Sequence, residues 1–495
     1  MKKLGNLLET KKSVVYVCIF ICAVLLSFTA TNNPFLPRNT GVDSSVFNYV
    51  AGVIRHGGMP YRDTFDHKGP LIYLIDALGQ LIHDPLGVWF IELITLSVIF
   101  LFAYKTAKLV GCNNTKSLIV VLLCMLSMAL YFEGGNFVEE YACLFIMIQL
   151  YIFVLFFTDK EISNLKLIAS GICFGAVCLL RLNMISLWIV MCIGVLIKCI
   201  KDKKPQRIGR FILWFLTGVC IIVLPIMIWL IAGGAFKPFI EDYFSFNILY
   251  SSYPGNGTLI NIVKAVVIFM MTPPVLLSIC ILAIVGFKDK KLLDLLCLAA
   301  LFLSILMECM AGQRYLHYGM IFCPIAVYAF SKAFTSEHIT QLKIFKHKAK
   351  LLIGVCAALV LCIVGLTVIG ISLESLVKKV TGMYRTEEFT EAKEVSDIVV
   401  ANSDENDKII VLGINDIIYL LSHREASSRY SYQKPILLID PERKEEFLAD
   451  MRKLETKIIV TGKDSEIKAY IEDLISEHYT LIRTVKQLEI YKISK

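Results

Sequence analysis

Long apolar runs separated by short polar stretches recur up to residue 371, and they restrict the fold more than any other feature of this sequence. A helix that crosses a bilayer needs roughly 20 predominantly apolar residues, and about eleven runs approach that length, with an uncertainty of one or two because several are shorter. The chain is 56% hydrophobic and only 19% charged, with a mean hydropathy of +0.67, which is too apolar for a soluble protein. The sequence therefore predicts an α-helical polytopic membrane protein with about 11 transmembrane helices. The expected spans are residues 14–30, 88–110, 118–132, 141–157, 167–180, 184–200, 211–231, 259–287, 292–310, 318–334 and 351–371.

Lysine and arginine concentrate in alternate loops, all on the side of the N-terminus. Positively charged loops stay in the cytoplasm, so we expect a multi-pass protein of the cell membrane with a cytoplasmic N-terminus. This distribution also explains the net charge of +8 without a nucleic-acid partner. The first apolar run resembles a signal sequence, but it is about as long as a span and lacks a small-residue cleavage site, so we expect it to remain as an anchor. The basic loops are residues 105–116, 160–166, 198–210, 288–291 and 343–350.

The 16 cysteines all lie in or beside apolar segments, and none follows Cys362. No two of them form a CxxC pair. Cysteines in such surroundings behave as small hydrophobic residues, so we expect neither disulfides nor a cysteine metal site.

The character of the chain changes after Ile371, where charges become frequent. Short β-rich runs at 408–413, 435–440 and 457–462 alternate with helical segments such as 442–451, which predicts a small C-terminal α/β domain. The glycines that follow the β-rich runs form no GxGxxG loop, so we interpret them as turns that end strands. We expect a transmembrane catalytic domain over 1–372, with a first extracytoplasmic loop at 32–86. An odd number of spans then places the α/β domain, 373–495, outside the cytoplasm.

The loops expected to face outward hold the polar clusters of the chain. The longest polar run covers 42–71, where Asp43 opens a short amphipathic helix and Asp66, His67 and Lys68 follow. The apolar segment 71–82 is too short for a span, so we expect a helix half-buried in the outer leaflet. The other outward loops are 132–141, the tip at Arg181, 236–257 and 312–318.

Asp43 has two interpretations. Aspartate is a favoured N-cap, and Asp43 stands where a helix should begin. It could also act as a general base that takes the proton of an acceptor hydroxyl at the outer membrane face. Asp66, Glu139 and Glu140 are the other candidate catalytic acids, although the two glutamates could also simply complement the dipole of the helix that they precede.

Three cations are candidates for binding a phosphate at the outer face: Lys68, Arg181 and Arg314. A lysine at this depth can equally snorkel from the interface, so the DHKGP cluster counts for more than Lys68 alone. His67 and His317 could share a divalent metal, although two histidines without known proximity predict it only weakly. We further expect four side chains of these loops to contact substrate: Tyr61, Asn136, His317 and Tyr318.

Nearly the whole chain resembles the GT-C class of membrane glycosyltransferases, the group that holds aminoarabinose transferases and protein O-mannosyltransferases. The segments that carry the resemblance are GVDSSVFNYVA, YRDTFDHKGPLIYLI, FEGGNFVEEYA and GQRYLHY, with INDIIYLLSHREASSRY in the tail. The resemblance implies a polyprenyl-phosphate sugar as donor and an inverting transfer. It matches Asp43 to the first-loop catalytic acid and Lys68 to a lysine that approaches the donor phosphate. His67 stands where the aminoarabinose transferases carry a glutamate.

The expected partners are therefore a polyprenyl-phosphate-linked sugar, membrane lipids and a glycan, lipid or protein acceptor. No cofactor is required by the sequence. One alternative is a transporter or flippase of lipid-linked saccharides, which would show inverted repeats and broken helices with polar groups near mid-membrane. Another is a nonenzymatic subunit of an envelope complex, against which the cluster in the first loop argues.

Overall fold

The computed structural model describes residues 12–33, 41–84, 86–158, 162–253, 257–289, 291–340, 370, 387–413 and 416–494. The chain divides into two compact units, and each is assembled from three separate stretches. We call them the helical unit (Met1–Ala30, Phe90–Ile226 and Pro254–Ser375) and the mixed unit (Thr31–Trp89, Met227–Tyr253 and Leu376–Lys495).

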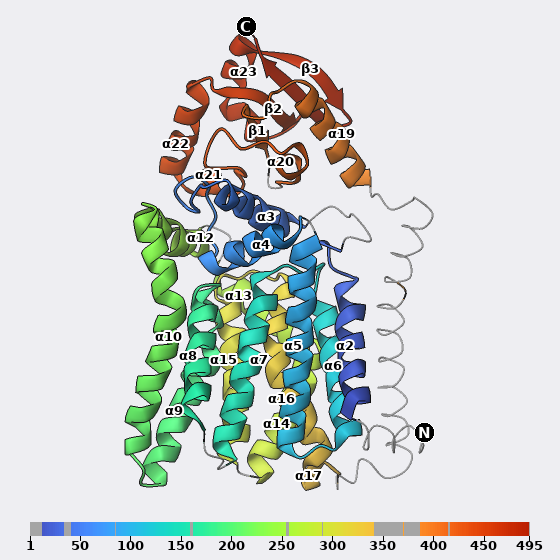
Figure 1. Cartoon of the computed structure of the whole chain (residues 1–495), viewed down its shortest axis with the longest axis vertical. Coiled ribbons are helices and arrows are strands. Elements are labelled where there is room, and N and C mark those ends of the chain that lie inside the picture. The colour runs from blue at the N-terminus through green and yellow to red at the C-terminus, as the bar shows by residue number, and fades with distance from the viewer. Residues whose placement is uncertain are drawn as a thin grey trace. The chain divides into compact units, whose positions relative to one another are not determined.

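The helical unit is a bundle whose long helices run side by side (Figure 1). Its segments are helical because a backbone in hydrocarbon has to satisfy its own hydrogen bonds. Among the described residues, five helices are long and apolar enough to cross a membrane: α5 (Leu86–Val110), α6 (Asn114–Tyr131), α7 (Val138–Phe157), α10 (Gln206–Ala232) and α15 (Leu292–Cys309). The predicted count of about eleven spans stays a prediction, and the expected span at 351–371 lies outside the described residues. The helices that belong mainly to this unit are α2 (Lys12–Ser27), α5 (Leu86–Val110), α6 (Asn114–Tyr131), α7 (Val138–Phe157), α8 (Asn164–Cys178), α9 (Ser186–Lys201), α10 (Gln206–Ala232), α13 (Leu259–Met271), α14 (Pro273–Asp289), α15 (Leu292–Cys309), α16 (Cys323–Thr335) and α17 (Glu337–Thr340), with short turns η1 (Leu182–Met184) and η3 (Leu316–Phe322).

The sequence predicted a single span at 259–287, but this apolar run is not one straight helix. It forms α13 and α14, which meet at an angle of 78°. The break falls at Thr272, whose ψ of 139° is extended. Pro273 explains it, because the residue before a proline is driven out of the helical region and proline itself donates no backbone hydrogen bond.

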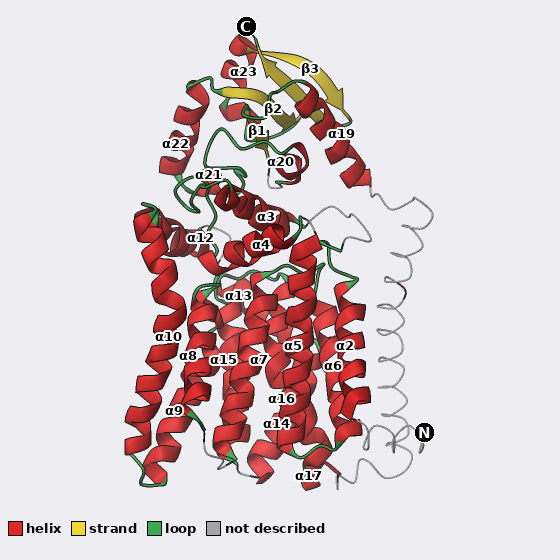
Figure 2. Cartoon of the chain, viewed as in Figure 1, coloured by secondary structure: helices red, strands yellow, loops and turns green. Residues whose placement is uncertain are grey.

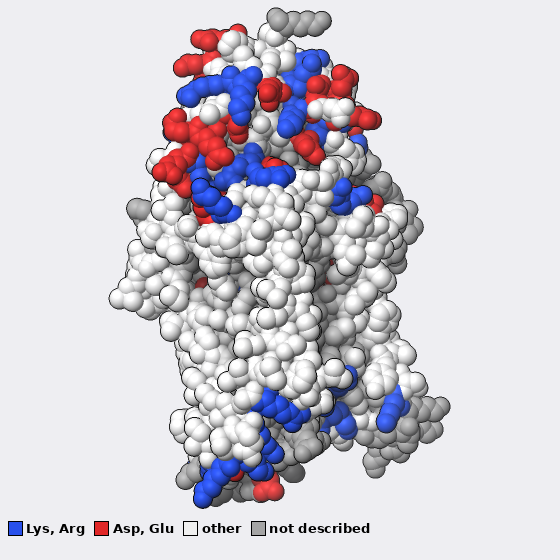
Figure 3. Space-filling view, turned by 60° about the vertical axis from the view of Figure 1, so that its left-hand side comes forward, with Lys and Arg blue, Asp and Glu red and all other residues white. Residues whose placement is uncertain are grey.

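Charge is unevenly spread over the helical unit (Figure 3). Its visible side is almost free of charged residues along the length of the helices, and lysine and arginine gather at one end. This is the pattern that apolar spans with basic loops produce.

The mixed unit is built on a four-stranded sheet with the order β1-β2-β4-β3, and Figure 2 shows its strands in yellow. β1 and β2 pair in parallel, whereas β4 runs antiparallel to both of its neighbours. β1 and β2 are continuous β-branched runs, as buried strands require. The elements are α3 (Val42–Arg55), α4 (Pro70–Ile82), α11 (Phe236–Ile240), η2 (Glu241–Ser245), α12 (Phe246–Ser252), α19 (Glu387–Ala401), β1 (Lys408–Leu412), α20 (Ile417–Ser422), α21 (Ile436–Ile439), α22 (Pro441–Arg452), β2 (Thr456–Gly462), η5 (Lys468–Tyr470), α23 (Glu472–His478), β3 (Tyr479–Val485) and β4 (Leu488–Ile493).

The predicted C-terminal sheet is confirmed, but one of its expected strands is wrong. The run PILLID forms the short helix α21 instead. A four-residue apolar run has no periodicity that separates a strand from a buried helix, and Asp440 directly after it caps α22 by accepting from two backbone N–H groups. The hairpin of β3 and β4 was missed because polar residues such as Thr480, Arg483, Glu489 and Lys492 interrupt the apolar pattern of both strands.

Both helices expected in the first loop are present as α3 and α4. They pack against each other, with Gln80 donating to the Asn48 carbonyl at 2.8 Å. The opposite side of α3 enters the core of the sheet, where Tyr49 and Val53 pack with Ile409 of β1 and other apolar residues of the mixed unit. The first loop is therefore held by the same core as the C-terminal sheet.

Candidate functional site

Asp43 lies in the first turn of α3 and is half-buried. The N-cap position belongs to Gly41, which has no side chain that could cap the helix. Asp43 is therefore not the N-cap, although a carboxylate in a first turn still complements the helix dipole. Among the described residues its side chain forms no ion pair.

Asp66 lies in the same unit and is only 3% exposed. Its two side-chain oxygens accept hydrogen bonds from the hydroxyls of Tyr73 and Tyr432, each at 2.8 Å, and from the backbone N–H of His67 at 2.7 Å. Burial raises the pKa of Asp66, while the nearby Lys68 charge opposes that shift. With three donors on one buried carboxyl group, Asp66 is suited to holding the loop in place.

His67 and Lys68 continue this network. The Lys68 ammonium lies 3.2 Å from Nε2 of His67, and since an ammonium can only donate, this nitrogen must accept. The ring proton then belongs on Nδ1, which lies 3.4 Å from an Asp66 oxygen. Within the described part of the chain Lys68 forms no ion pair with a carboxylate, so its remaining N–H groups can bind an anion.

The C-terminal part of the chain supplies residues to this cluster that sequence reasoning missed. Besides Tyr432, which is far from Asp66 in sequence, these include Asp416, whose backbone N–H donates to the Ser45 hydroxyl at 3.1 Å. The side chain of Asp416 accepts from Ser431 at 2.7 Å, and burial raises its pKa to about 7. The charges of Asp43, Asp66 and Asp416 all act on the Tyr432 hydroxyl. The only sequence signal was the resemblance of the segment INDIIYLLSHREASSRY, to which no role could be given.

A second network in the mixed unit joins the segment 227–253 to the C-terminal residues. Asp242 is fully buried and lies between Arg443 at 2.6 Å and Arg429 at 3.1 Å. The guanidinium of Arg443 also lies 4.8 Å from the centre of the Phe65 ring. Burial raises the pKa of Asp242, and the two arginines counteract this. These contacts fix the loop that carries Asp66.

Tyr61 was expected to contact substrate, and it is buried in the mixed unit. Its hydroxyl donates to the carbonyl of Lys68 at 2.7 Å, and its ring packs on Tyr73 and Phe239. Its φ of +67° places it in the left-handed region, which a bulky residue rarely adopts. These contacts hold the turn from Tyr61 to Lys68 closed.

In the helical unit, Arg181 lies between two carboxylates. Glu139 is 2.5 Å from its guanidinium and Glu308 is 3.3 Å from it, while the ring of Tyr318 lies 4.3 Å away. Glu308, near the end of α15, was missed because a single acid in an apolar run gives no motif. With two carboxylates already bound, Arg181 has less positive charge to offer a phosphate than the sequence suggested.

The FEGGN turn of the helical unit is built from left-handed residues, with positive φ at each position from Glu133 to Asn136. Glycines at its two central positions permit this run. Asn136 is buried, donates its backbone N–H to Glu140 at 2.9 Å and accepts from the Tyr141 hydroxyl at 3.0 Å. Asn136 and Glu140 therefore shape the turn together.

His317 contacts the FEGGN turn of the helical unit. Its backbone N–H and its Nδ1 contact one Glu133 oxygen at 2.9 and 2.8 Å, which lowers the pKa of Glu133. Its ring stacks on Phe137 with centroids 4.1 Å apart.

Arg314 is exposed and has no ion pair with any described carboxylate. His317 belongs to the helical unit and His67 to the mixed unit, and no three His, Cys, Asp or Glu side chains of the described residues form a group that could hold a metal.

Comparisons with known proteins bear on the fold. The family model described as "Putative competence-induced protein Ccs4 N-terminal domain" matches residues 7–351. No functionally curated protein matches this chain.

Solved structures match nearly the whole chain. ArnT from Cupriavidus metallidurans bound to undecaprenyl phosphate has a TM-score of 0.62 and 10% identity, over 96% of this chain and 97% of that chain. Its apo state has a TM-score of 0.62 and 10% identity, over 97% and 98%. The oligosaccharyltransferase AglB from Archaeoglobus fulgidus, in complex with an inhibitory peptide and a dolichol-phosphate, is similar with a TM-score of 0.47 and 12% identity, over 98% and 75%. The likeness to ArnT confirms the predicted GT-C-like fold.

Proposed function

The chain belongs to the competence-induced Ccs4 family, whose model covers most of its length, and we propose that it works as a membrane glycosyltransferase. The donor is a polyprenyl-phosphate sugar, and the acceptor is a hydroxyl of an envelope glycan, lipid or protein outside the cytoplasm. The sugar passes to the acceptor with inversion. Support comes from the shared fold with ArnT, one of whose structures holds undecaprenyl phosphate.

One observation carries the proposal: an acid and a cation suited to this reaction lie in one compact unit, within electrostatic reach of the buried, hydrogen-bonded pair of Tyr432 and Asp66. The Asp43 charge acts on the Tyr432 hydroxyl, and the Lys68 charge acts on Asp66, to which Tyr432 donates at 2.8 Å. The side chains of Asp43 and Lys68 are both only partly buried. Among the described residues, neither side chain forms an ion pair with an oppositely charged side chain, and Lys68 contacts only the neutral Nε2 of His67.

The chemistry then divides between these two residues. Asp43 takes the proton from the acceptor hydroxyl as its oxygen forms a bond to the anomeric carbon. The bond from that carbon to the phosphate oxygen breaks, and the carrier phosphate leaves with the electron pair. Lys68 stabilises the charge on the departing phosphate, which needs a cation more than a proton. A single displacement of this kind inverts the anomeric centre.

The other candidate residues receive supporting roles in this proposal. Asp66 holds His67 and Lys68, and the paired Arg181 positions Glu139. Arg314 of the helical unit, which is exposed and has no ion pair with a described carboxylate, stays a predicted phosphate-binding residue. Glu140 shapes the FEGGN turn.

The proposal is tested by transfer from radiolabelled undecaprenyl-phosphate sugars in membranes that contain the protein. Asp43→Asn removes the base but keeps the shape, so transfer should fall by roughly a hundredfold or more, with unchanged expression and detergent stability. Asp84→Asn, on a 54% exposed acid of the same unit, is the matched control and should transfer at the parental rate. Parental transfer by Asp43→Asn would remove Asp43 from the mechanism.

One observation favours a second candidate, a flippase of lipid-linked saccharides. The bend between α13 and α14 is a broken helix, and transporters often place such breaks at their binding sites. Among the described residues, the Thr272 hydroxyl at this break accepts from the Tyr131 hydroxyl and donates to the Phe269 carbonyl, which are both neutral groups. In proteoliposomes a flippase would move the labelled donor across the bilayer without forming a glycosylated product.

A further inference from the structure

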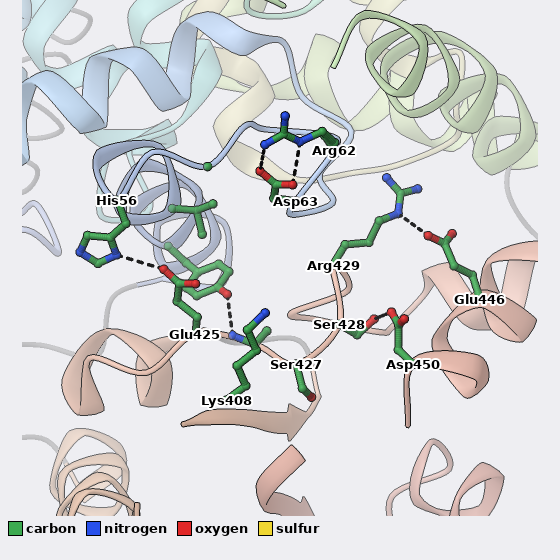
Figure 4. A pocket seen from close by; sticks show the side chains of 14 residues that line it. His56, Arg62, Asp63, Lys408, Glu425, Ser427, Ser428, Arg429, Glu446 and Asp450 are labelled. Carbon is green, nitrogen blue, oxygen red and sulfur yellow. Dashed lines mark hydrogen bonds and ion pairs between the residues drawn. The ribbon is translucent and has the colours of Figure 1, made fainter. Parts of the chain in front are cut away.

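The mixed unit contains an open pocket of about 410 Å³ that shares no residue with the proposed transfer site (Figure 4). This volume lies within the range of small-molecule sites. Its walls come from the last turns of α3, the loop 58–63, the start of β1, the segment 425–429 and α22. Along α3 the pocket is lined from Tyr49 to the C-cap residue His56. At 1.5 Å per residue, these residues lie roughly 9 to 20 Å along the helix axis from Asp43.

Most of the charges that line the pocket are paired with one another. His56 contacts Glu425 at 3.1 Å, and Arg62 contacts Asp63 through two nitrogens. Figure 4 shows these pairs at the rim of the cavity.

The pairing continues on the side of α22. Arg429 contacts Glu446 at 3.1 Å, and Asp450 accepts from the Ser428 hydroxyl and from Lys453, each at 2.8 Å. The wall thus presents both hydrogen-bond acceptors and donors.

Lys408 differs from the other cations. It is the exposed first residue of β1, and its side chain points into the cavity in Figure 4. Among the described residues no carboxylate forms an ion pair with it. Lys408 is therefore the lining cation without a carboxylate partner among the described residues, while the lining carboxylate Asp450 is paired with Lys453, which does not line the pocket.

The residues that line the pocket favour one class of ligand. An apolar ligand would displace water from the charged walls, which is costly. A polyanion would meet four carboxylates: Asp63, Glu425, Glu446 and Asp450. A ligand rich in hydroxyl groups, which both donate and accept, fits a wall that carries both donors and acceptors, and one anionic substituent fits Lys408. We propose that this pocket binds an acidic saccharide, a sugar unit that bears a single carboxylate or phosphate.

The test measures binding of named sugars to the purified full-length protein by saturation-transfer NMR and calorimetry, without a donor. Glucuronic acid and glucose 6-phosphate should bind at least tenfold more tightly than glucose or glucosamine. Lys408→Ala should remove this preference, and Lys408→Glu should exclude the acidic sugars and admit glucosamine. Lys463→Ala, on an exposed lysine outside the pocket, is the matched control and should bind as the parent does. Thermal unfolding establishes that each variant is folded.

Three outcomes would overturn the inference. The first is unchanged affinity in folded Lys408→Ala. The second is equal binding of inorganic phosphate, which would reduce the pocket to a simple anion site, and the third is no binding of any of these sugars. Asp43→Asn should bind the acidic sugars as the parent does, because the pocket does not depend on transfer. Failure of this inference is therefore separate from failure of the proposed transferase.

Discussion

At the scale of single residues, partners decide what an ionisable side chain can do. Asp66 and Arg181 are both candidate site residues by sequence, yet one carboxyl group accepts three hydrogen bonds and one guanidinium contacts two carboxylates. Within the described residues, Asp43 and Lys68 have no such set of partners. In the proposed transfer, Asp66 and Arg181 therefore support the site, and Asp43 and Lys68 carry out the chemistry.

Asp416 should make the stability of the protein depend on pH. Its pKa is raised to about 7 by burial, whereas an unfolded aspartate has a pKa of about 4. Between these values the folded state keeps a proton that the unfolded state has released, so the free energy of unfolding falls as pH rises. Asp416→Asn imitates the neutral form, so its melting temperature should decline less than the parental one between pH 5 and pH 8.

The measurement is thermal unfolding in detergent at a series of pH values. Asp464→Asn, on an exposed acid of the same unit, should follow the parental curve. Equal slopes for the parent and Asp416→Asn would show that Asp416 is already ionised in the folded protein.

At the scale of elements, one buried ion cluster fastens η2 to the C-terminal part of the mixed unit. Asp242→Ala would leave Arg429 and Arg443 buried without their shared carboxylate. Breaking a buried pair on one side costs about 3–5 kcal/mol, so a clear fall in melting temperature is expected.

The neighbouring residue provides the control for this change. Glu241 pairs with Lys237 on the surface at 3.6 Å, and an exposed pair contributes only about 0–1 kcal/mol. Glu241→Ala should therefore unfold close to the parental temperature. Similar effects of the two substitutions would mean that the Asp242 cluster does not hold these elements together.

At the scale of the whole molecule, the basic loops predict that residues after 371 face away from the cytoplasm. Single cysteines at the exposed positions Glu405 and Lys203 test this with a membrane-impermeant thiol reagent in intact cells. Glu405→Cys should react, and Lys203→Cys should react only after the cells are permeabilised. The parent protein, whose own cysteines give the background, is the control. The reverse labelling would contradict both the orientation and an extracytoplasmic transfer site.

Much of the fold could be predicted from sequence because the signals are local. Apolar runs of membrane length marked α5, α7, α10 and α15, and the amphipathic pattern after Asp43 marked α3. The sheet was predicted where its strands are continuous β-branched runs, and missed at β3 and β4, where polar residues obscure the pattern. The bend at Thr272 had a signal in the two prolines that follow it.

The sequence by itself determined the membrane class, the placement of most helices and the loops in which polar groups gather, since hydropathy and periodicity act within a few residues of the chain. Only the tertiary structure decided which of these polar groups meet. Tyr432 reaches Asp66, Arg429 reaches Asp242, and Glu308 reaches Arg181, and in each pair more than 100 residues separate the partners. Such pairs leave no local pattern, because their contact depends on how the sheet core and the helices close those long loops.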